Sequence, residues 1–305
     1  MRERLVDELS ALARVDHRIV LLTADLGFGA LDKFADEFPE RYFNVGVAEQ
    51  SLIATATGLA EAGYIPYCYS IATFASLRGL EFIRNGPVAH RLPVRIMGIG
   101  PGMDYVFDGL SHFAVDDIGA LRCQPGLTIW APSDNSDISD QIAFINSLSG
   151  PVYMRILRNG PYCLVSRLSA ASDIGMKICV LSLGDAHLIG EETIEKLKVL
   201  GLEASHQVVT LLDETTSVSL KRHLETSTIC IVAENHYVIG GLASLVSEVV
   251  ANNGLNIKVI PVGIKSLPIG KLGNASYLRE RFMTNIDDAV RDAHRFVTIK
   301  AKAKK

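Results

Sequence analysis

The strongest constraint on the fold is a regular alternation between short apolar runs and segments with helical periodicity. Residues 18–25 are almost continuously apolar, which is typical of a strand that is buried on both faces. A helical pattern precedes this run in residues 2–14, and strands and helices continue to alternate as far as residue 262, with a helix expected at about residues 73–88 and a strand at residues 207–211. Such alternation predicts parallel strands that are joined by right-handed helical crossovers. We therefore expect an α/β fold.

The length of the chain predicts more than one domain. A chain of 305 residues exceeds the usual size of a single hydrophobic core. Residues 160–176 show no periodicity and contain proline, glycine and several serines, which indicates a crossing between domains. We expect two successive domains, residues 1–165 and 176–305, each a mostly parallel sheet that is flanked by helices.

Composition narrows the class of function. A net charge of -4 gives no electrostatic reason to expect binding to nucleic acid or to an anionic membrane. The five cysteines are widely spaced, odd in number and without a Cys-x-x-Cys pair, which argues against a disulfide framework or a zinc site. The first residues do not form a signal peptide, and no apolar run is long enough to span a bilayer. We expect a cytoplasmic protein without a membrane segment.

A change of period marks the first candidate site. Residues 43–47 alternate as a half-buried strand does, whereas residues 48–62 follow a helical period. Glu49 therefore falls in the first turn of a helix, directly after a strand, where ligands bind in open α/β sheets. Alternatively, Glu49 only complements the positive end of the helix dipole. Judged from this stretch alone, the second interpretation describes the more common case.

The second candidate site is a loop that precedes a predicted helix at residues 114–122. Asp108 and His112 lie in this loop, and loops carry chemistry more often than cores do. Taken by themselves, an aspartate and a histidine four residues apart more often serve as helix caps or surface groups. The spacing alone therefore leaves both interpretations open.

Considered together and in order, five segments resemble the pyrimidine-binding and C-terminal domains of transketolase-like thiamine diphosphate enzymes. The segments are Gly46-Val47-Ala48-Glu49-Gln50, Ala72-Thr73-Phe74, Asp108-Gly109-x-x-His112 with Asp117-Ile118-Gly119, Ala131-Pro132-Ser133-Asp134, and Ala233-Glu234-Asn235-His236 with Gly240-Gly241. The resemblance extends over nearly the whole chain, to about residue 295. It implies that Glu49 is catalytic.

The resemblance assigns two residues to the cofactor. In this family a glutamate forms a hydrogen bond to N1' of the pyrimidine ring of thiamine diphosphate and promotes its imino tautomer. By resemblance, Glu49 is that residue. Phe74 matches the aromatic position that lies against the pyrimidine ring.

The resemblance also implies a set of substrate contacts. Asp108 and His112 match positions that face the first hydroxyl and carbonyl groups of a sugar donor, where they would form hydrogen bonds and move protons. Arg158 matches an arginine that binds a substrate phosphate, for which a guanidinium fork is suited. Thr23 occupies a Ser/Thr position near the same phosphate.

Two positions depart from the family pattern. Many members carry histidine where this chain has Gly100, and an acidic residue where it has Phe107. The histidine usually contacts the phosphate of the acceptor, so the acceptor here is expected to be unusual or less firmly held. Phe107 makes the surroundings of Asp108 more apolar.

A further motif is missing from the chain. The family binds Mg2+ and the diphosphate through a Gly-Asp-Gly segment, which belongs to a domain that precedes the pyrimidine-binding domain. No Gly-Asp-Gly occurs in this sequence, and the chain begins at the first helix of the pyrimidine-binding domain. The resemblance thus implies no metal site here, a separate N-terminal-type subunit that holds Mg2+ and shares the cofactor, and an α2β2 assembly.

The function expected from the resemblance is that of the second, or β, subunit of a split transketolase. Such an enzyme transfers a two-carbon ketol unit between sugars or sugar phosphates in carbohydrate metabolism. Alternatives are the β subunit of a 2-oxo-acid decarboxylating dehydrogenase and a 1-deoxyxylulose 5-phosphate synthase-like condensing enzyme. A degenerate scaffold subunit is a further alternative. The motif Asp108-Gly109-x-x-His112 favours the transketolase over the dehydrogenase. Glu49, Phe74, Asp108 and His112 occur together, which argues against a scaffold, because a scaffold needs none of them.

Overall fold

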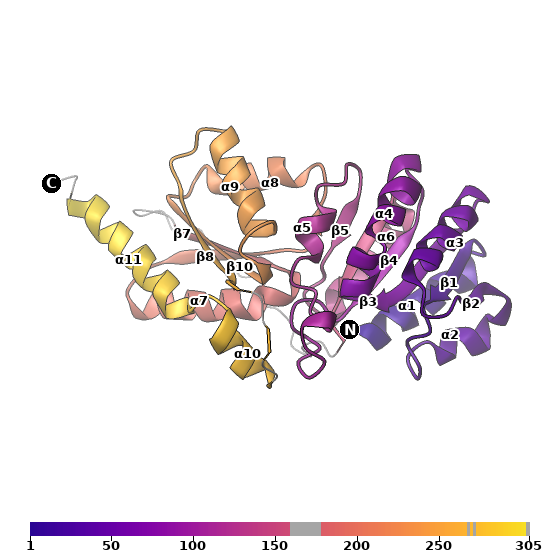
Figure 1. The fold of residues 1–305 in the computed structure, drawn as a ribbon. Helices are drawn as coiled ribbons and strands as arrows, with labels where there is room; N and C mark the ends of the chain where they lie inside the picture. Colours follow the sequence, from indigo (N-terminus) through magenta and orange to yellow (C-terminus); the bar gives the residue numbers. More distant parts are fainter. Residues whose placement is uncertain (159–177, 267–268, 271–272, 303–305) are drawn as a thin grey trace.

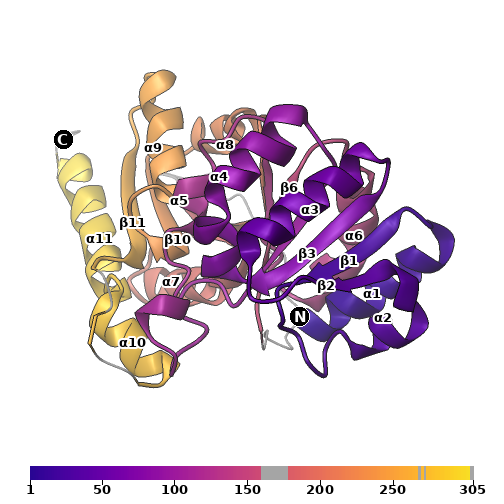
Figure 2. The ribbon, with the colours of Figure 1, turned by 45° about the vertical axis from the view of Figure 1, so that its right-hand side comes forward.

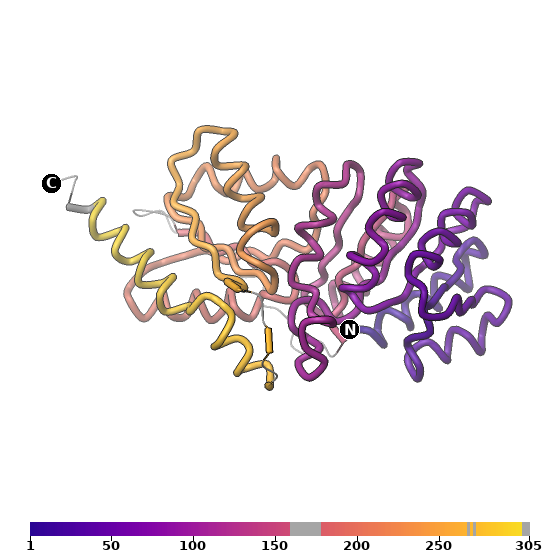
Figure 3. Tube along the Cα trace, viewed as in Figure 1, coloured from indigo at the N-terminus to yellow at the C-terminus, as the bar shows by residue number. Residues whose placement is uncertain are grey.

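The computed structural model contains two β-sheets, which lie beside each other along the length of the molecule (Figure 1). It describes residues 1–158, 178–266, 269–270 and 273–302. The N-terminus lies near the middle of the molecule, whereas the last helix extends at one end (Figure 3). The expected limits at residues 165 and 176, and most of the expected crossing at 160–176, fall outside the described residues.

The first sheet has seven strands in the order β2-β1-β3-β4-β6-β5-β9, and only β9 is antiparallel to its neighbour. The strands are β1 Ile19–Thr23, β2 Tyr42–Asn44, β3 Ile65–Ile71, β4 Arg95–Ile99, β5 Thr128–Trp130, β6 Val152–Ile156 and β9 Leu211–Leu212. The central strands are buried along their whole length, as expected for parallel strands that are covered by helices on both faces.

Helices cover both faces of this sheet (Figure 2). One face carries α1 Arg2–Val15, α2 Asp32–Glu37 and α6 Asn135–Ser147, and the other carries α3 Glu49–Glu61, α4 Leu80–Ile83 and α5 Asp117–Leu121. Short 3-10 turns occupy Pro39–Arg41, Leu110–His112 and Gly184–Ala186.

The helix that the sequence predicts at residues 73–88 is not a uniform α-helix. Two π-helical segments, Phe74–Arg78 and Arg84–Val88, flank α4. Pro87 lies in the second segment, where its missing N–H group disrupts the regular hydrogen-bond pattern. The wider π turn after β3 sets the positions of Phe74 and Arg78.

The second sheet has the order β11-β10-β7-β8, and all its neighbouring strands are parallel. The strands are β7 Ile178–Leu183, β8 Ala204–Val209, β10 Ile229–Tyr237 and β11 Lys258–Ile264. Helices α7 His187–Val199, α10 Ala275–Phe282 and α11 Ile286–Lys302 cover one face, and α8 Thr216–Leu224 and α9 Leu242–Asn252 cover the other (Figure 1). The expected fold class, two mostly parallel sheets with flanking helices, is confirmed.

The two sheets share part of their hydrophobic core. One apolar cluster continues beneath α3, α5, α8 and α9 and so joins one face of both sheets. The strand predicted at residues 207–211 divides into β8, which belongs to the second sheet, and β9, which pairs with β5 in the first. Ala131 N–H also donates to Thr210 C=O at 2.8 Å, so the chain crosses between the sheets at this point. None of the helices in the described part of the chain combines the length and apolar character that a bilayer span needs.

Candidate functional site

The parallel register of the first sheet brings the candidate residues to one edge. Thr23 pairs with Asn44 and with Tyr69, so the carboxyl ends of β1, β2 and β3 meet. Chain order reverses on the two sides of β1, because β2 lies on one side and β3 on the other. Such a switch point opens a crevice for ligands outside the carboxyl ends of the strands.

Hydrogen bonds between the loops after β1 and β2 fix the approach to Glu49. The Asn44 amide donates to Asp25 Oδ1 at 2.8 Å and accepts from the N–H of Gly46 at 2.9 Å. Gly46 has a φ of 76°, which a glycine adopts without strain. The chain then enters α3 with Glu49 as its first residue. The sequence pattern therefore predicted the start of this helix correctly.

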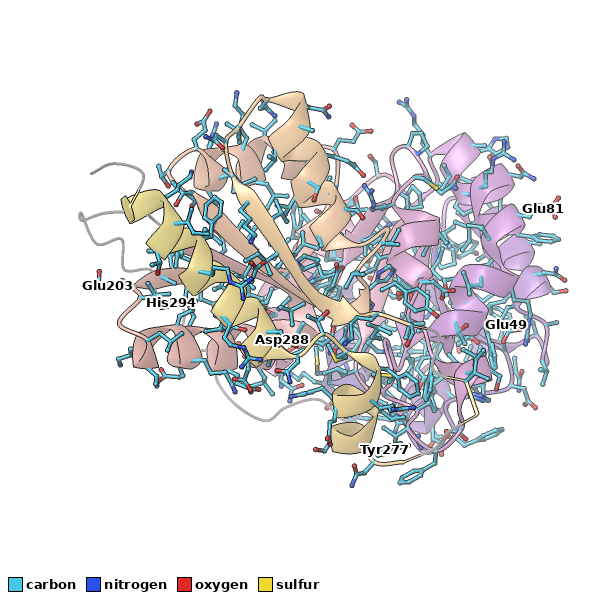
Figure 4. All side chains as sticks on the ribbon, turned by 60° about the vertical axis from the view of Figure 1, so that its left-hand side comes forward. Glu49, Glu81, Glu203, Tyr277, Asp288 and His294 are labelled. Carbon is cyan, nitrogen blue, oxygen red and sulfur yellow. The ribbon has the colours of Figure 1, made fainter. Side chains whose placement is uncertain are left out.

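Glu49 is a buried carboxylate with two partners. The residue is 1% exposed, although it lies at the end of a helix that covers the sheet (Figure 4). Ser70 Oγ donates to Oε1 at 2.9 Å, and Arg78 Nη1 donates to Oε2 at 2.6 Å. A residue that only complemented the helix dipole would normally remain in water, so burial argues for a more specific role.

A continuous series of side-chain contacts leads from Glu49 to Arg158. The Arg78 guanidinium carbon lies 4.3 Å from the centroid of the Phe74 ring, and Phe74 also contacts His112, at 5.1 Å between ring centroids. His112 is also 5.6 Å from the ring of Tyr105, which in turn lies 4.9 Å from the Arg158 guanidinium carbon. The structure thus brings four predicted residues (Glu49, Phe74, His112 and Arg158) into one cluster, through Arg78 and Tyr105.

Arg158 lies directly after β6 and presents an exposed side chain. Its backbone N–H donates to Asp104 Oδ2 at 2.8 Å, which anchors the position of the residue. Burial raises the pKa of Asp104, and Arg158 opposes this shift through the hydrogen bond from its backbone and through its charge. The guanidinium remains available to an anion.

Asp108 and Thr23 lie apart from this series of contacts. Asp108 is exposed, and its backbone N–H donates to Tyr105 C=O at 3.0 Å. Phe107 beside it is 71% exposed. The Thr23 hydroxyl is buried and donates its hydrogen to Leu26 C=O at 2.8 Å. That hydrogen is therefore engaged within its own turn, and the predicted contact of Thr23 with a phosphate would require this bond to break.

Tyr105 occupies the space beside Gly100, where many family members have histidine. Gly100 has a φ of 76°, and a Cβ atom there would lie 2.1 Å from the Tyr105 ring. A histidine at this position would require both a strained backbone and a displaced Tyr105. The departure at Gly100 is therefore coupled to the aromatic ring that contacts His112 and Arg158.

A second charged cluster, which the sequence did not suggest, joins the two sheets. Arg155 of β6 is fully buried, and its guanidinium donates to Asp117 Oδ2 at 3.0 Å and to Asp185 Oδ1 at 2.6 Å. It also donates to Asn235 C=O at 2.7 Å, while the Asn235 amide donates to Asp185 at 2.6 Å. Burial alone would lower the pKa of Arg155, but Asp117 and Asp185 raise it above its ordinary value.

His236 completes this junction as a neutral imidazole. Its Nε2 accepts from Gly119 N–H at 3.1 Å, and its Nδ1 lies 2.8 Å from Tyr237 C=O and must donate to it. Burial lowers the pKa of His236. Gly119 and Gly240 are in backbone contact here, because a Cβ on Gly240 would lie 3.1 Å from the Gly119 Cα. The predicted motif at residues 233–241 is thus part of the packing between the halves.

Within the residues that the structure describes, no group of three His, Cys, Asp or Glu side chains could hold a metal ion.

Comparison with known proteins identifies this arrangement. Residues 1–160 match the family model of the transketolase pyrimidine-binding domain. The chain is 34% identical, over 91% of its length and 90% of the relative, to a protein of Methanocaldococcus jannaschii that is named as a transketolase C-terminal section. It is 31% identical, over 96% of its length and 93% of the relative, to a 6-deoxy-6-sulfo-D-fructose transketolase subunit of Clostridium sp..

Among solved structures, the chain resembles a split-gene transketolase that was determined as an inactive β4 tetramer. The TM-score is 0.84 at 29% sequence identity, and the match covers 97% of this chain and 98% of the other. Each of these three relatives is matched over nine-tenths or more of its own length.

Proposed function

The chain belongs to the transketolase family, and we propose that it is the C-terminal, or β-type, subunit of a split thiamine diphosphate-dependent transketolase. The complete enzyme would transfer a two-carbon ketol unit between sugars or sugar phosphates. The observation that carries the proposal is the burial of the Glu49 carboxylate, which shares the Arg78 guanidinium with Phe74, at the switch point of the first sheet.

The residues present fit the pyrimidine half of the cofactor. Glu49 offers a buried oxygen that already accepts from a planar, positively charged group, and Phe74 offers a ring face to the same group. In the complete enzyme, Glu49 would hold a hydrogen bond to pyrimidine N1' and Phe74 would orient the ring. Bound thiamine diphosphate supplies the nucleophilic carbon to which the two-carbon unit is transferred.

The other predicted residues, two in the cluster and two outside it, fit a sugar substrate. His112 contacts Phe74 and would donate to, or accept from, oxygen atoms of the donor sugar. Asp108 is exposed nearby and would bind a hydroxyl group. Arg158 would bind a substrate phosphate or another anionic terminus through its exposed guanidinium. For Thr23 we propose only a subsidiary contact, because its hydroxyl hydrogen is engaged.

The diphosphate and Mg2+ require a partner. The described residues contain no metal-ligand cluster, and the similar chains are named as subunits or sections of transketolases. We propose that an N-terminal-type subunit holds Mg2+ and the diphosphate, that the two chains form an α2β2 enzyme, and that this enzyme is cytoplasmic.

The proposal is tested by Glu49→Gln in the complex of this chain with its partner. An amide cannot stabilise a protonated N1', so ketol transfer from a ketose donor should fall by at least about a hundredfold, mainly in kcat. Glu81→Gln serves as the control, because Glu81 is an exposed carboxylate on α4 (Figure 4). Near-wild-type turnover of the Glu49 variant would show that Glu49 has no catalytic role.

A further inference from the structure

Arg78 already makes the two contacts that a pyrimidine ring would need. Its Nη1 donates to Glu49 Oε2 at 2.6 Å, and its guanidinium lies 4.3 Å from the Phe74 ring centroid. A guanidinium is planar and cationic and carries N–H donors at its edge, so it resembles a protonated aminopyrimidine in shape and charge. Arg78 therefore already contacts both residues, Glu49 and Phe74, that the proposed function assigns to the cofactor ring.

Without Arg78, the Glu49 carboxylate would be a buried charge without a cationic partner. Glu49 is 1% exposed, and Ser70 Oγ, the other described donor to its carboxylate, is neutral. An unpaired buried carboxylate is strongly unfavourable, so the free chain needs a cation at this position. Arg78 supplies that charge.

The Arg78 guanidinium can also leave this position at a low cost in free energy, whereas the buried Glu49 carboxylate cannot. Its side chain in the ion pair is 44% exposed. The residue ends the π-helical segment Phe74–Arg78, and Gly79 follows it. Rotation about its own side-chain bonds would move the guanidinium into solvent without opening the core, because its hydrogen bond and ring contact with described residues are those with Glu49 and Phe74.

We propose that Arg78 is a displaceable placeholder, which occupies the pyrimidine position in the cofactor-free chain and competes with thiamine diphosphate for Glu49 and Phe74. The inference rests on the proposed function, since it assumes that Glu49 and Phe74 bind the pyrimidine ring. Its consequence is that part of the cofactor's binding free energy is used to displace Arg78. Apparent affinity for the cofactor is correspondingly lower than that of an open site.

The first test is calorimetric titration of thiamine diphosphate with Mg2+ into the complex of this chain with its partner. Arg78→Met removes both the charge and the planar group that stacks on Phe74. We expect this change to lower the cofactor Kd by about tenfold, which corresponds to the combined free energies of a half-exposed ion pair and a cation–π contact. Arg78→Lys, which keeps the charge without the plane, should fall between. Arg84→Met is the matched control, because Arg84 is an exposed arginine on the next turns, and it should leave the Kd unchanged.

The second test needs no cofactor and measures the coupling between Glu49 and Arg78 in thermal unfolding of the chain alone. Arg78→Met should lower the Tm, whereas the same change in a Glu49→Gln background should have little effect, because the buried charge has been removed. Equal losses of Tm in both backgrounds would contradict the placeholder.

The outcomes separate this inference from the proposed function. An unchanged or weaker cofactor Kd in Arg78→Met, while Glu49→Gln still abolishes turnover, would overturn the placeholder and leave the function intact. A rise in KM for a phosphorylated sugar in Arg78→Met, at a constant cofactor Kd, would make Arg78 a substrate ligand and also overturn it. Absence of cofactor binding by the wild-type complex would instead refute the proposed function.

Discussion

Two arginines three residues apart at the end of β6 belong to opposite kinds of charged cluster. Arg155 is fully buried and is bound by Asp117, Asp185 and Asn235, which come from both halves of the molecule. Arg158 is exposed, stacks on Tyr105, and has a backbone N–H that is held by Asp104. The first cluster joins the two sheets, and the second faces outward from the carboxyl edge of one sheet.

The difference shows how the same residue type is used for structure and for binding. Around Arg155, protein groups surround the guanidinium and leave no side that a ligand could reach. In the cluster of Glu49, Arg78, Phe74 and His112, one member has a half-exposed side chain whose contacts can be exchanged for those of a ligand. We therefore assign stability to the junction and chemistry to the open edge.

The largest expected effect is on stability, at the junction. Arg155→Met leaves Asp117 and Asp185 as buried carboxylates without a cationic partner among the described residues, which should lower the free energy of unfolding by about 3–5 kcal/mol. Arg158→Met, the matched change at the open edge, should cost less than about 0.5 kcal/mol. Urea denaturation of both variants measures the difference. Similar losses in the two variants would remove the distinction between the clusters.

The next effect is on substrate affinity, at the open edge. Arg158→Ala in the assembled enzyme should raise KM for a phosphorylated sugar by about one to two decades, because one charge-assisted hydrogen bond contributes roughly 1.5–3 kcal/mol. An unphosphorylated analogue of the same sugar should be nearly unaffected. The comparison uses kcat/KM for matched phosphorylated and free sugars. Equal losses on both would mean that Arg158 has a structural role after all.

The smallest expected effect is a pH dependence of the stability that the junction contributes. His236 is held neutral in the folded protein, with its pKa lowered from the ordinary value of 6.5 by burial. As the pH falls below about 6.5, the unfolded chain binds a proton that the folded chain excludes, so the free energy of unfolding decreases with a slope of at most about 1.4 kcal/mol per pH unit. The stability that His236 contributes is thus present above this pH and is lost on acidification.

The measurement is urea denaturation between pH 5 and 8 for wild type, His236→Asn and His223→Asn. In the His236 variant, the free energy of unfolding should decrease less steeply on acidification than in wild type. His223 is an exposed histidine, so its variant should follow the wild-type curve. Parallel curves for all three proteins would show that His236 is not excluded from protonation.

The sequence predicted much of the fold because buried parallel strands and amphipathic helices leave strong periodic patterns. It did not predict that residues 204–212 divide between two sheets, since one apolar stretch serves both strands and only the partners differ. Nor did it predict the π-helical turns around α4, which depend on how Phe74 and Arg78 pack. Periodicity records which residues are buried, but not the strand or turn against which they are buried.

At the site, the sequence pattern placed Glu49 correctly at the start of α3. The structure adds Arg78, the partner of Glu49 that the sequence analysis did not identify. Arg78 was missed, although its position four residues after Phe74 on a predicted helix could have suggested that the two share a face. Arg155 was also missed, despite being a charged residue within an apolar strand, which is a sign of buried pairing. Its two carboxylate partners come from distant segments, and no local pattern identifies them.

The central claim is that the open edge forms only the pyrimidine half of a cofactor site. It is tested most directly by calorimetric titration of thiamine diphosphate with Mg2+ into this chain purified alone. We predict no tight, Mg2+-dependent binding, because no group of three His, Cys, Asp or Glu side chains among the described residues could hold the metal, and because Arg78 occupies Glu49. A tight, Mg2+-dependent isotherm without a partner subunit would contradict the account.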